Sequence, residues 1–274
     1  MTAGLAPAPA PIPVPTLAGP VTQLHVVRSE WAKLRGLRST WYCALTAVLL
    51  IVGLGAVIAA AGSTYQTAHL SPAKAMSISL LGVILAQLII GVLSVLAFSG
   101  EYGTGMIRGT LAAVPSRLPV LWAKLIAMGG LVLSVTLVSA ALEFFVVTAI
   151  QSARGAPLIT LTDPGVLRVM VGSSLYLLVV AVIGLALGAL VRKTAAGLAV
   201  FAAVFFVAPN IVGLLPHSIA GVARYLPSNA GGVLWGSTWA PAHPLSPWPG
   251  FAVLCGYAVV LIGLAAWQLR RRDA

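Results

Sequence analysis

The side chains that could do chemistry in this chain are few, and their spacing does not assemble a catalytic set. The 274 residues include only five Asp and Glu residues and four His residues, spread along the whole chain. An enzyme needs its nucleophile, acid and base gathered where each can reach the reacting atoms. We therefore expect no enzymatic activity, although a membrane enzyme or an assembly protein that does not transport stays an alternative.

Glu143 is the one acid that falls inside a long apolar segment. Counted from Lys124 at 1.5 Å per helical residue, it lies about 28 Å along the segment, toward the outer leaflet. Ionisable residues within a membrane are candidates for function. A secondary transporter or channel that uses Glu143 is therefore one alternative, and a purely structural role for Glu143 is another.

Histidines and cysteines give little support for a metal site. His69, His217 and His243 lie in scattered, Pro-rich loop segments, which is typical of solvated histidines. Cys43 and Cys255 fall inside apolar segments and lack the spacing of metal ligands. We expect no metal, and two thiols that behave as small hydrophobic groups.

A nucleotide site is not expected either. The sequence contains no G-x-x-x-x-G-K-[ST] phosphate loop, and the nearest pair, Lys193-Thr194, lacks the glycines. The chain is therefore expected to bind no cofactor of its own. Any ATP and Mg²⁺ would have to be bound by a partner chain.

Membrane-spanning helices are the elements that must position these residues. The chain is 59% hydrophobic and 8% charged, whereas soluble domains carry about 25% charged residues. Six segments reach the ~20 apolar residues that cross a bilayer as a helix. These segments cover residues 42–62, 76–98, 124–150, 169–191, 194–215 and 250–269. The sequence predicts an all-α polytopic membrane protein with six transmembrane helices, in one domain over 41–274.

The basic residues predict how these helices are oriented. The side that would hold both termini collects twelve Lys and Arg residues: Arg28, Lys33, Arg35, Arg38, Arg108, Arg117, Lys124, Arg192, Lys193, Arg270, Arg271 and Arg272. The other side collects four: Lys74, Arg154, Arg168 and Arg224. Because cytoplasmic loops are enriched in Lys and Arg, both termini are expected in the cytoplasm, with the protein in the cell membrane. The net charge of +11 arises from these Lys and Arg residues between the apolar segments, as membrane orientation requires. No nucleic-acid partner is therefore expected.

Two segments precede the first span. Residues 1–20 alternate Pro with Ala and are expected to form a disordered tail. Residues 21–40 are expected to form an amphipathic helix at the inner membrane interface, with Lys33 and Arg35 largely off its apolar face. That face would carry four residues at helical spacing: Leu24, Val27, Trp31 and Leu34. An ordinary solvated linker helix is the alternative.

The outer connection over 216–249 is rich in Pro and Trp. Trp235, Trp239 and Trp248 are expected in an interfacial aromatic belt. Pro209 and Asn210, near the end of the fifth span, predict a kink followed by short helices that enter the outer leaflet. Together with Glu143, they are candidates for a translocation path.

The connection over 99–123 resembles the corresponding segment of ABC-2 type transporter permeases. The residues that carry the resemblance are Glu101, Gly103, Thr104, Gly105, Thr110, Leu111, Pro115, Arg117 and Lys124. The stretch from Ser29 to Trp41 is similar to that of actinobacterial members of the family. The resemblance extends over nearly all of the chain beyond the tail.

The resemblance implies an ABC-2 type permease fold in which this connection forms a coupling helix against an ABC ATPase subunit. Gly103 and Gly105 would allow a tight turn out of the second span. Met106, Ile107 and Leu111 would form an apolar anchor. Pro115 would end the element, and Arg117 and Lys124 would hold it against lipid headgroups or the partner. A plain solvated loop is the alternative.

The family also implies a function. A permease subunit would pair with a second permease copy or a paralogue and with separate ATPase chains. It would move a hydrophobic or amphiphilic solute across the membrane, with export expected.

Overall fold

The computed structural model describes residues 22–62, 70–106, 109, 118–214, 221–237 and 243–271, which form helices and short turns with no strand among them. The longer helices are α1 (Gln23–Gly36), α2 (Arg38–Ala61), α5 (Gly82–Gly103), α7 (Leu118–Ala153), α8 (Val166–Val191) and α13 (Pro247–Arg271). The shorter helices are α4 (Pro72–Ser79), α9 (Thr194–Ala202), the π-helical η1 (Ala203–Val207), α10 (Ala208–Gly213), the 3₁₀ turn η2 (Gly221–Tyr225) and α12 (Pro227–Gly232).

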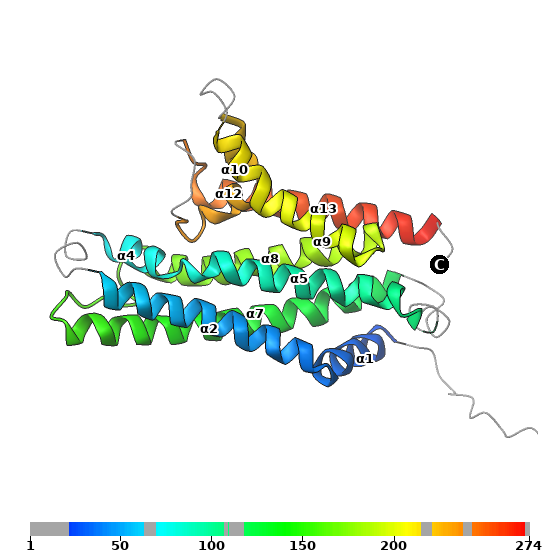
Figure 1. Ribbon diagram of the computed structural model, residues 1–274, viewed down its shortest axis with the longest axis horizontal. Coiled ribbons are helices and arrows are strands. Elements are labelled where there is room, and N and C mark those ends of the chain that lie inside the picture. The colour runs from blue at the N-terminus through cyan, green and yellow to red at the C-terminus, as the bar shows by residue number, and fades with distance from the viewer. Residues whose placement is uncertain are drawn as a thin grey trace, which may run out of the picture.

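Four antiparallel helices form the body of the molecule. Helices α2, α5, α7 and α8 lie side by side, with α8 the most buried of them (Figure 1). Helix α13 packs on the outer side of α8, and α1 crosses the first turns of α7. Within the described residues, six helical segments are long and apolar enough to cross a membrane, as the sequence predicts.

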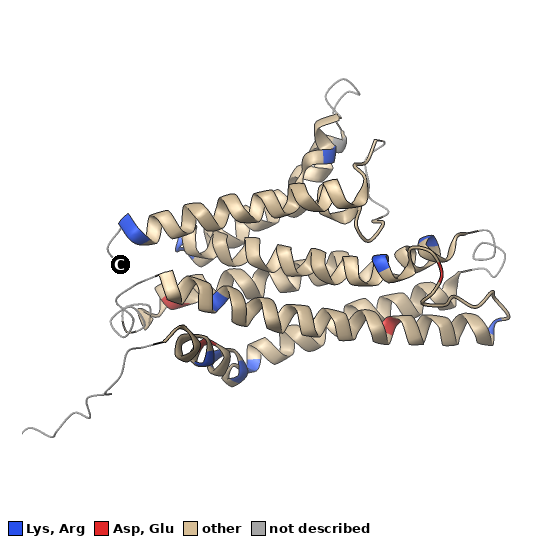
Figure 2. Ribbon diagram, turned by 180° about the vertical axis from the view of Figure 1, so that it is seen from behind, with Lys and Arg blue, Asp and Glu red and all other residues tan. Residues whose placement is uncertain are grey.

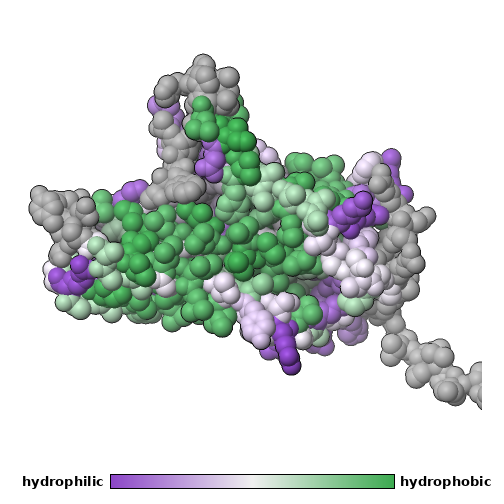
Figure 3. All heavy atoms as spheres, viewed as in Figure 1, coloured by the Kyte–Doolittle hydropathy of each residue, from purple (hydrophilic) through white to green (hydrophobic). Residues whose placement is uncertain are grey.

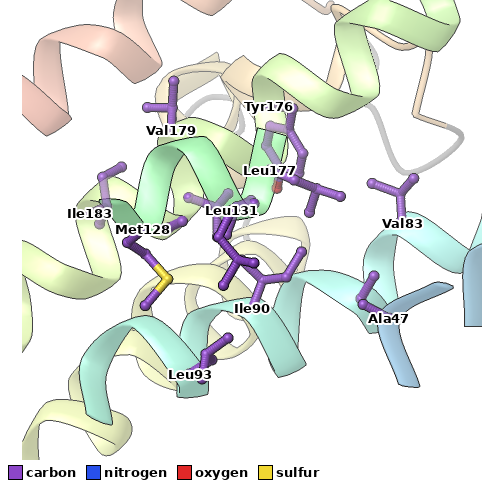
Figure 4. Packing of buried hydrophobic residues seen from close by; sticks show 14 of the residues in the cluster. Ala47, Val83, Ile90, Leu93, Met128, Leu131, Tyr176, Leu177, Val179 and Ile183 are labelled. Carbon is purple, nitrogen blue, oxygen red and sulfur yellow. The ribbon is translucent and has the colours of Figure 1, made fainter. Parts of the chain in front are cut away.

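The core of this body is apolar and closely packed. Figure 4 shows Ile90 and Leu93 of α5 facing Met128 and Leu131 of α7, with Ile183 of α8 beside them. All five side chains are at most 8% exposed. Because a helix in lipid gains little from burying apolar groups alone, such contacts stabilise the bundle mainly by close packing.

Glycines allow the closest approaches between helices. A Cβ added at Gly82 would lie 2.2 Å from the carbonyl oxygen of Leu50, so α5 begins in direct contact with the backbone of α2. A Cβ added at Gly91 would lie 1.9 Å from the ring of Phe201 in α9. Only glycine fits at either place without displacing its neighbour.

The second predicted span begins differently from its expected range of 76–98. A turn at Leu80 and Leu81 separates α4 from α5, and the backbone N–H of Val83 donates to the oxygen of Leu80 at 2.9 Å. The chain bends there because Gly82 must meet α2 closely. Helix α5 then continues to Gly103, five residues beyond the expected end.

The irregularity expected near Pro209 is the π-helical turn η1. Pro209 has no N–H and its ring would crowd the carbonyl of Phe205 in a regular helix. The wider turn removes that conflict, and the N–H of Ala208 donates to the oxygen of Ala203, five residues earlier. Beyond it, α10 stands off the four-helix body (Figure 1), whereas α12 packs on α13 and contacts α8.

The two ends of the bundle carry the charges. We call them the α1 end, where α5 and α13 also finish, and the opposite end, where α2 and α7 finish. Figure 2 shows Lys, Arg, Asp and Glu concentrated at both ends, and Figure 3 shows an apolar surface between them. At the opposite end, Arg154 donates to the carbonyl oxygens of Ala59 and Ala60, which finish α2. A cation placed there complements the negative end of the helix.

The two described tryptophans of the outer connection lie in different environments, and Trp239 lies outside the described residues. Trp248 is 62% exposed at the start of α13, as an interfacial residue would be. Trp235 instead is 1% exposed and packs on Tyr176, with 6.4 Å between ring centroids. The turn that follows α12 carries Trp235 back into the bundle, so the belt prediction is wrong for this residue.

Candidate functional site

Four charged side chains meet at the α1 end of the bundle. Glu30 and Lys33 lie one turn apart on α1, Glu101 lies in the last turn of α5, and Lys124 lies in the second turn of α7. We call these four residues the charge cluster. Its members come from three helices that are far apart in sequence, and they meet because α1 crosses α7 beside the end of α5.

Ion pairs hold the cluster together. Lys124 Nζ donates to Glu30 Oε2 and to Glu101 Oε1, both at 2.7 Å. Lys33 Nζ donates to Glu30 Oε1 at 2.7 Å and to Glu101 Oε1 at 3.0 Å. A third hydrogen bond runs from Lys124 Nζ to the carbonyl oxygen of Ala97 at 3.3 Å. Each lysine therefore joins both carboxylates, and the two positive charges balance the two negative ones.

Burial makes these pairs energetically important. The side chains of Lys124, Glu30 and Glu101 are 4%, 5% and 8% exposed, while that of Lys33 is 30% exposed. Charges taken out of water cost several kcal/mol each unless they are paired and hydrogen-bonded. Burial alone would lower the pKa of Lys33, but its hydrogen bonds to Glu30 and Glu101 raise that pKa above its ordinary value. The ammonium therefore stays charged at neutral pH.

A second set of contacts joins α5 to the turn between α8 and α9. The guanidinium of Arg192 lies 5.1 Å from the ring centroid of Tyr102, at the distance of a cation–π contact. Arg192 itself has a left-handed backbone, with φ +57°, which closes this turn. The hydroxyls of Ser99 and Thr194 are 3.1 Å apart on the same side of α5. The last two turns of α5 are thus held by α1, α7, α8 and α9 together.

The arrangement ties the end of α5 to α1 and α7. Glu101 is two residues from the end of α5, so the segment that follows starts from a fixed point. Thr104 continues the chain with its hydroxyl donating to Gly100 at 3.0 Å, and Gly105 then turns it with φ +73°. A displacement of that segment would reach α1, α5 and α7 through buried charge pairs.

The predicted coupling residues divide between described and undescribed parts of the chain. Gly103 stays helical, so the tight turn belongs to Gly105 alone. Met106 is 52% exposed just beyond it. The remaining members of the predicted anchor and its end lie outside the described residues: Ile107, Thr110, Leu111, Pro115 and Arg117.

Lys124 occupies a different environment from the predicted one. The sequence places it against lipid headgroups or a partner, but the structure buries it between two carboxylates of its own chain. Helix α7 begins at Leu118, six residues earlier than the expected span, so Lys124 lies within the bundle. Glu30 was not among the predicted site residues. Its spacing of four residues from Val26 and from Leu34, both buried, is the signal that could have identified it.

The predicted interfacial helix corresponds to α1, which packs partly against the bundle. Leu34 is buried and Trp31 packs against the core, with the guanidinium of Arg35 5.8 Å from its ring. Leu24, expected on the apolar face, is 56% exposed, and Val26 is buried.

The structure does not bring the candidate translocation residues together. Glu143 of α7 is fully buried, neither carboxyl oxygen has a hydrogen-bond partner, and a Cβ added at Gly55 of α2 would lie 2.7 Å from Oε1. Pro209 and Asn210 line a separate small cavity with Tyr176 of α8. Asn210 is exposed, and its amide donates to the oxygen of Phe206 at 2.6 Å.

The described residues also bear on the expectation of no metal site. In the part of the chain that the structure describes, no three His, Cys, Asp or Glu residues gather as metal ligands. Cys43 and Cys255 are both free thiols, on α2 and α13.

Comparison with known proteins gives one match. A family model described as ABC-2 family transporter protein matches residues 26–215, which is more than two thirds of the chain. The matched region starts inside α1, contains the whole charge cluster and finishes just beyond α10. No curated protein matches the chain well enough to count as a relative.

Proposed function

Because this chain belongs to the ABC-2 transporter family, we propose that it is the permease subunit of an ABC transporter whose ATP hydrolysis takes place on a separate chain. The charge cluster is the observation that carries this proposal. It fixes the end of α5, where the coupling connection begins, to α1 and α7 through buried ion pairs. A permease needs such a rigid path because force must pass from a soluble motor into membrane helices.

The α1 end is proposed to face the cytoplasm. Twelve of the sixteen basic residues belong to that side in a six-span chain, and the bias of Lys and Arg toward cytoplasmic loops sets orientation. The first described helix and the C-terminal end of α13 both lie there, which agrees with termini on one side (Figure 1). The family and the similarity of residues 29–41 to actinobacterial members support a bacterial cell membrane as the location.

The ATPase is proposed to dock on the segment that follows α5. Gly105 has a left-handed backbone, with φ +73°, and Met106 beyond it presents an exposed apolar side chain. Docking of the ATPase would displace this segment, and the charge cluster would transmit the displacement to α1, α5 and α7. A second permease copy or a paralogue would complete the translocation path for the solute. The solute is proposed to be hydrophobic or amphiphilic and to move outward, because the described spans offer few polar anchors.

Replacing Met106 with Asp tests the docking surface. An unpaired charge buried in the contact costs several kcal/mol, and each 1.4 kcal/mol weakens association about tenfold. Association of the ATPase with the whole complex should therefore fall more than about a hundredfold, together with ATP hydrolysis stimulated by solute. Leu111→Asp should act in the same way, and Met106→Leu, which keeps the apolar surface, should not.

Co-purification of the ATPase with the permease shows whether this segment is the docking site. The Met106→Asp permease should still insert and fold, since the change lies outside the spans. Undiminished co-purification of the ATPase with both Asp variants would remove this segment as the docking site. Transport that continues without any ATPase would instead favour a secondary transporter that uses the buried, unpartnered Glu143.

A further inference from the structure

A groove of about 370 Å³ lies at the α1 end of the bundle, between the last two turns of α13 and the end of α8. Its lining consists of one residue of α8 and four of α13: Leu190, Leu264, Trp267, Gln268 and Arg271. The residues of α13 follow Leu264 by three, four and seven positions, so they share one face of that helix. The volume falls in the range of small-molecule sites.

The lining changes from apolar to cationic along the groove. Leu190 and Leu264 form the apolar part, and Arg271 lies at the end of α13, seven residues beyond Leu264. Seven helical residues span about 10 Å, so one ligand with an apolar chain and a charged head can reach both parts. Leu264 is 47% exposed and Trp267 is 54% exposed, so the groove opens to the surroundings of the protein.

Arg271 is positioned by stacking on the preceding turn of its own helix. Its guanidinium lies 4.8 Å from the ring centroid of Trp267, at the distance of a cation–π contact. A guanidinium that stacks by its face keeps its N–H donors at its edge, where they suit two oxygens of a phosphate. Gln268 adds a neutral amide, which is a further donor, to the same lining.

The charges around the groove favour an anion. Arg270 and Arg271 form the last turn of α13 (Figure 2), and Arg272 follows them in the sequence. Lys193 is exposed just beyond the end of α8, and one acid, Asp273, accompanies these four basic residues. None of the five lining residues is acidic, so a zwitterionic headgroup would bring a cation that meets no carboxylate in the lining.

We propose that this groove binds an anionic phospholipid. The phosphate lies against the guanidinium of Arg271 and the amide of Gln268, and an acyl chain extends along Leu264 toward Leu190. Inorganic phosphate has the same headgroup chemistry but would leave the apolar part empty, so the proposal is for the lipid. Binding depends neither on an ATPase nor on transport. Only the choice of the inner leaflet follows from the proposed orientation, and that leaflet carries the anionic lipids.

Native mass spectrometry of the purified permease in detergent tests the headgroup contact. The protein is titrated with dioleoylphosphatidylglycerol, and the dissociation constant of the first bound lipid is obtained from the populations. Arg271→Gln should raise this constant about tenfold, the loss expected for one charge-assisted contact. Arg35→Gln is the matched control, because Arg35 is also exposed and stacks on Trp31, at 5.8 Å, but does not line the groove. It should leave the constant unchanged.

A second pair of variants tests the acyl chain. Leu264→Asn places a polar amide in the apolar part of the groove and should weaken phosphatidylglycerol binding several-fold. Val260→Asn is the control, because Val260 lies one turn earlier on α13, is 60% exposed and does not line the groove. It should bind the lipid as the unchanged protein does. Inorganic phosphate at the concentration of the lipid should not displace it.

Several results would overturn the proposal. Dioleoylphosphatidylcholine that binds as tightly as phosphatidylglycerol would show a groove with no preference for an anion. Equal losses in Arg271→Gln and Arg35→Gln would show general attraction to the basic end, and no loss in Arg271→Gln would place the lipid elsewhere. Displacement by inorganic phosphate, or equal binding by Leu264→Asn and Val260→Asn, would remove the acyl chain from the groove. None of these results affects the docking test of Met106→Asp, so the two proposals can fail separately.

Discussion

Lys124→Met perturbs the charge cluster most directly. Lys124 donates to Glu30 and to Glu101 at 2.7 Å each, and its side chain is only 4% exposed. Methionine has nearly the same length and no charge, so the substitution removes the ion pairs while largely filling the space. The cluster would then hold two carboxylates and only the partly exposed Lys33, which leaves one negative charge uncompensated.

The size of the stability loss expected for Lys124→Met follows from the burial of the charge cluster. Removing one member of a buried ion pair typically destabilises a protein by about 3–5 kcal/mol, because the partner is left buried without compensation. The side chains of Lys124, Glu30 and Glu101 are each more than nine-tenths buried, so solvent screening reduces this destabilisation only slightly. We therefore expect the free energy of unfolding to fall by about 3 kcal/mol or more, which is over a hundredfold in the equilibrium constant.

The assay is denaturant unfolding of the permease in nanodiscs, followed by tryptophan fluorescence. Lys193→Met is the control, because Lys193 is exposed in the turn between α8 and α9, and its effect should stay within about 0.5 kcal/mol. The double variant Lys124→Met/Glu101→Gln removes one positive and one negative charge. It should be more stable than the sum of the single effects predicts, since the two groups are coupled.

Two results would refute this reasoning. Lys124→Met could unfold at the same denaturant concentration as Lys193→Met, and the cluster would then hold no helices together. The double variant could instead cost the full sum of its single changes, and Lys124 and Glu101 would then be independent. Either result would also remove the physical basis for force transmission through α1, α5 and α7.

Three further predictions concern topology, helix packing and the buried acid. In a chain whose native cysteines are replaced by alanine, Thr162→Cys should react with an impermeant maleimide from outside intact cells and Lys193→Cys should not; the reverse pattern would invert the orientation. Gly82→Ala should destabilise the bundle by at least about 1–3 kcal/mol, because its Cβ would lie 2.2 Å from a carbonyl oxygen of α2. Gly53→Ala, whose Cβ meets nothing within 4 Å, should be neutral or stabilising by up to about 1 kcal/mol, and similar unfolding of both variants would contradict the packing argument. Glu143→Gln should leave co-purification of the ATPase unchanged in a pull-down, since the residue lies far along α7 from the charge cluster; a loss of the ATPase would place Glu143 on the coupling path.

Much of the fold was predictable because its signals are local. Each span is an apolar segment long enough to cross a bilayer, and that property is visible in about 20 consecutive residues. Pro209 likewise predicts an irregular helix from its own covalent structure, and the π-helical turn over 203–207 is the result. Gly105 was predictable as a turn for the same reason, because only glycine adopts a left-handed backbone without strain.

The candidate site depended on contacts that no local pattern contains. Glu101 and Lys124 were identified by their place in a family-like segment, but neither their burial nor their pairing could be read from it. Glu30 and Lys124 are 94 residues apart, and they meet only because α1 folds back across α7.

The sequence by itself determined that this chain is a helical membrane protein with six spans, because hydrophobicity and length act within one segment at a time. Tertiary structure alone decided the pairing of Glu30 with Lys124, the bend before Gly82 and the groove between α8 and α13. Each of these depends on where two helices touch. That position is set by small side chains and by the need to pair buried charges, and both become defined only when the bundle is assembled.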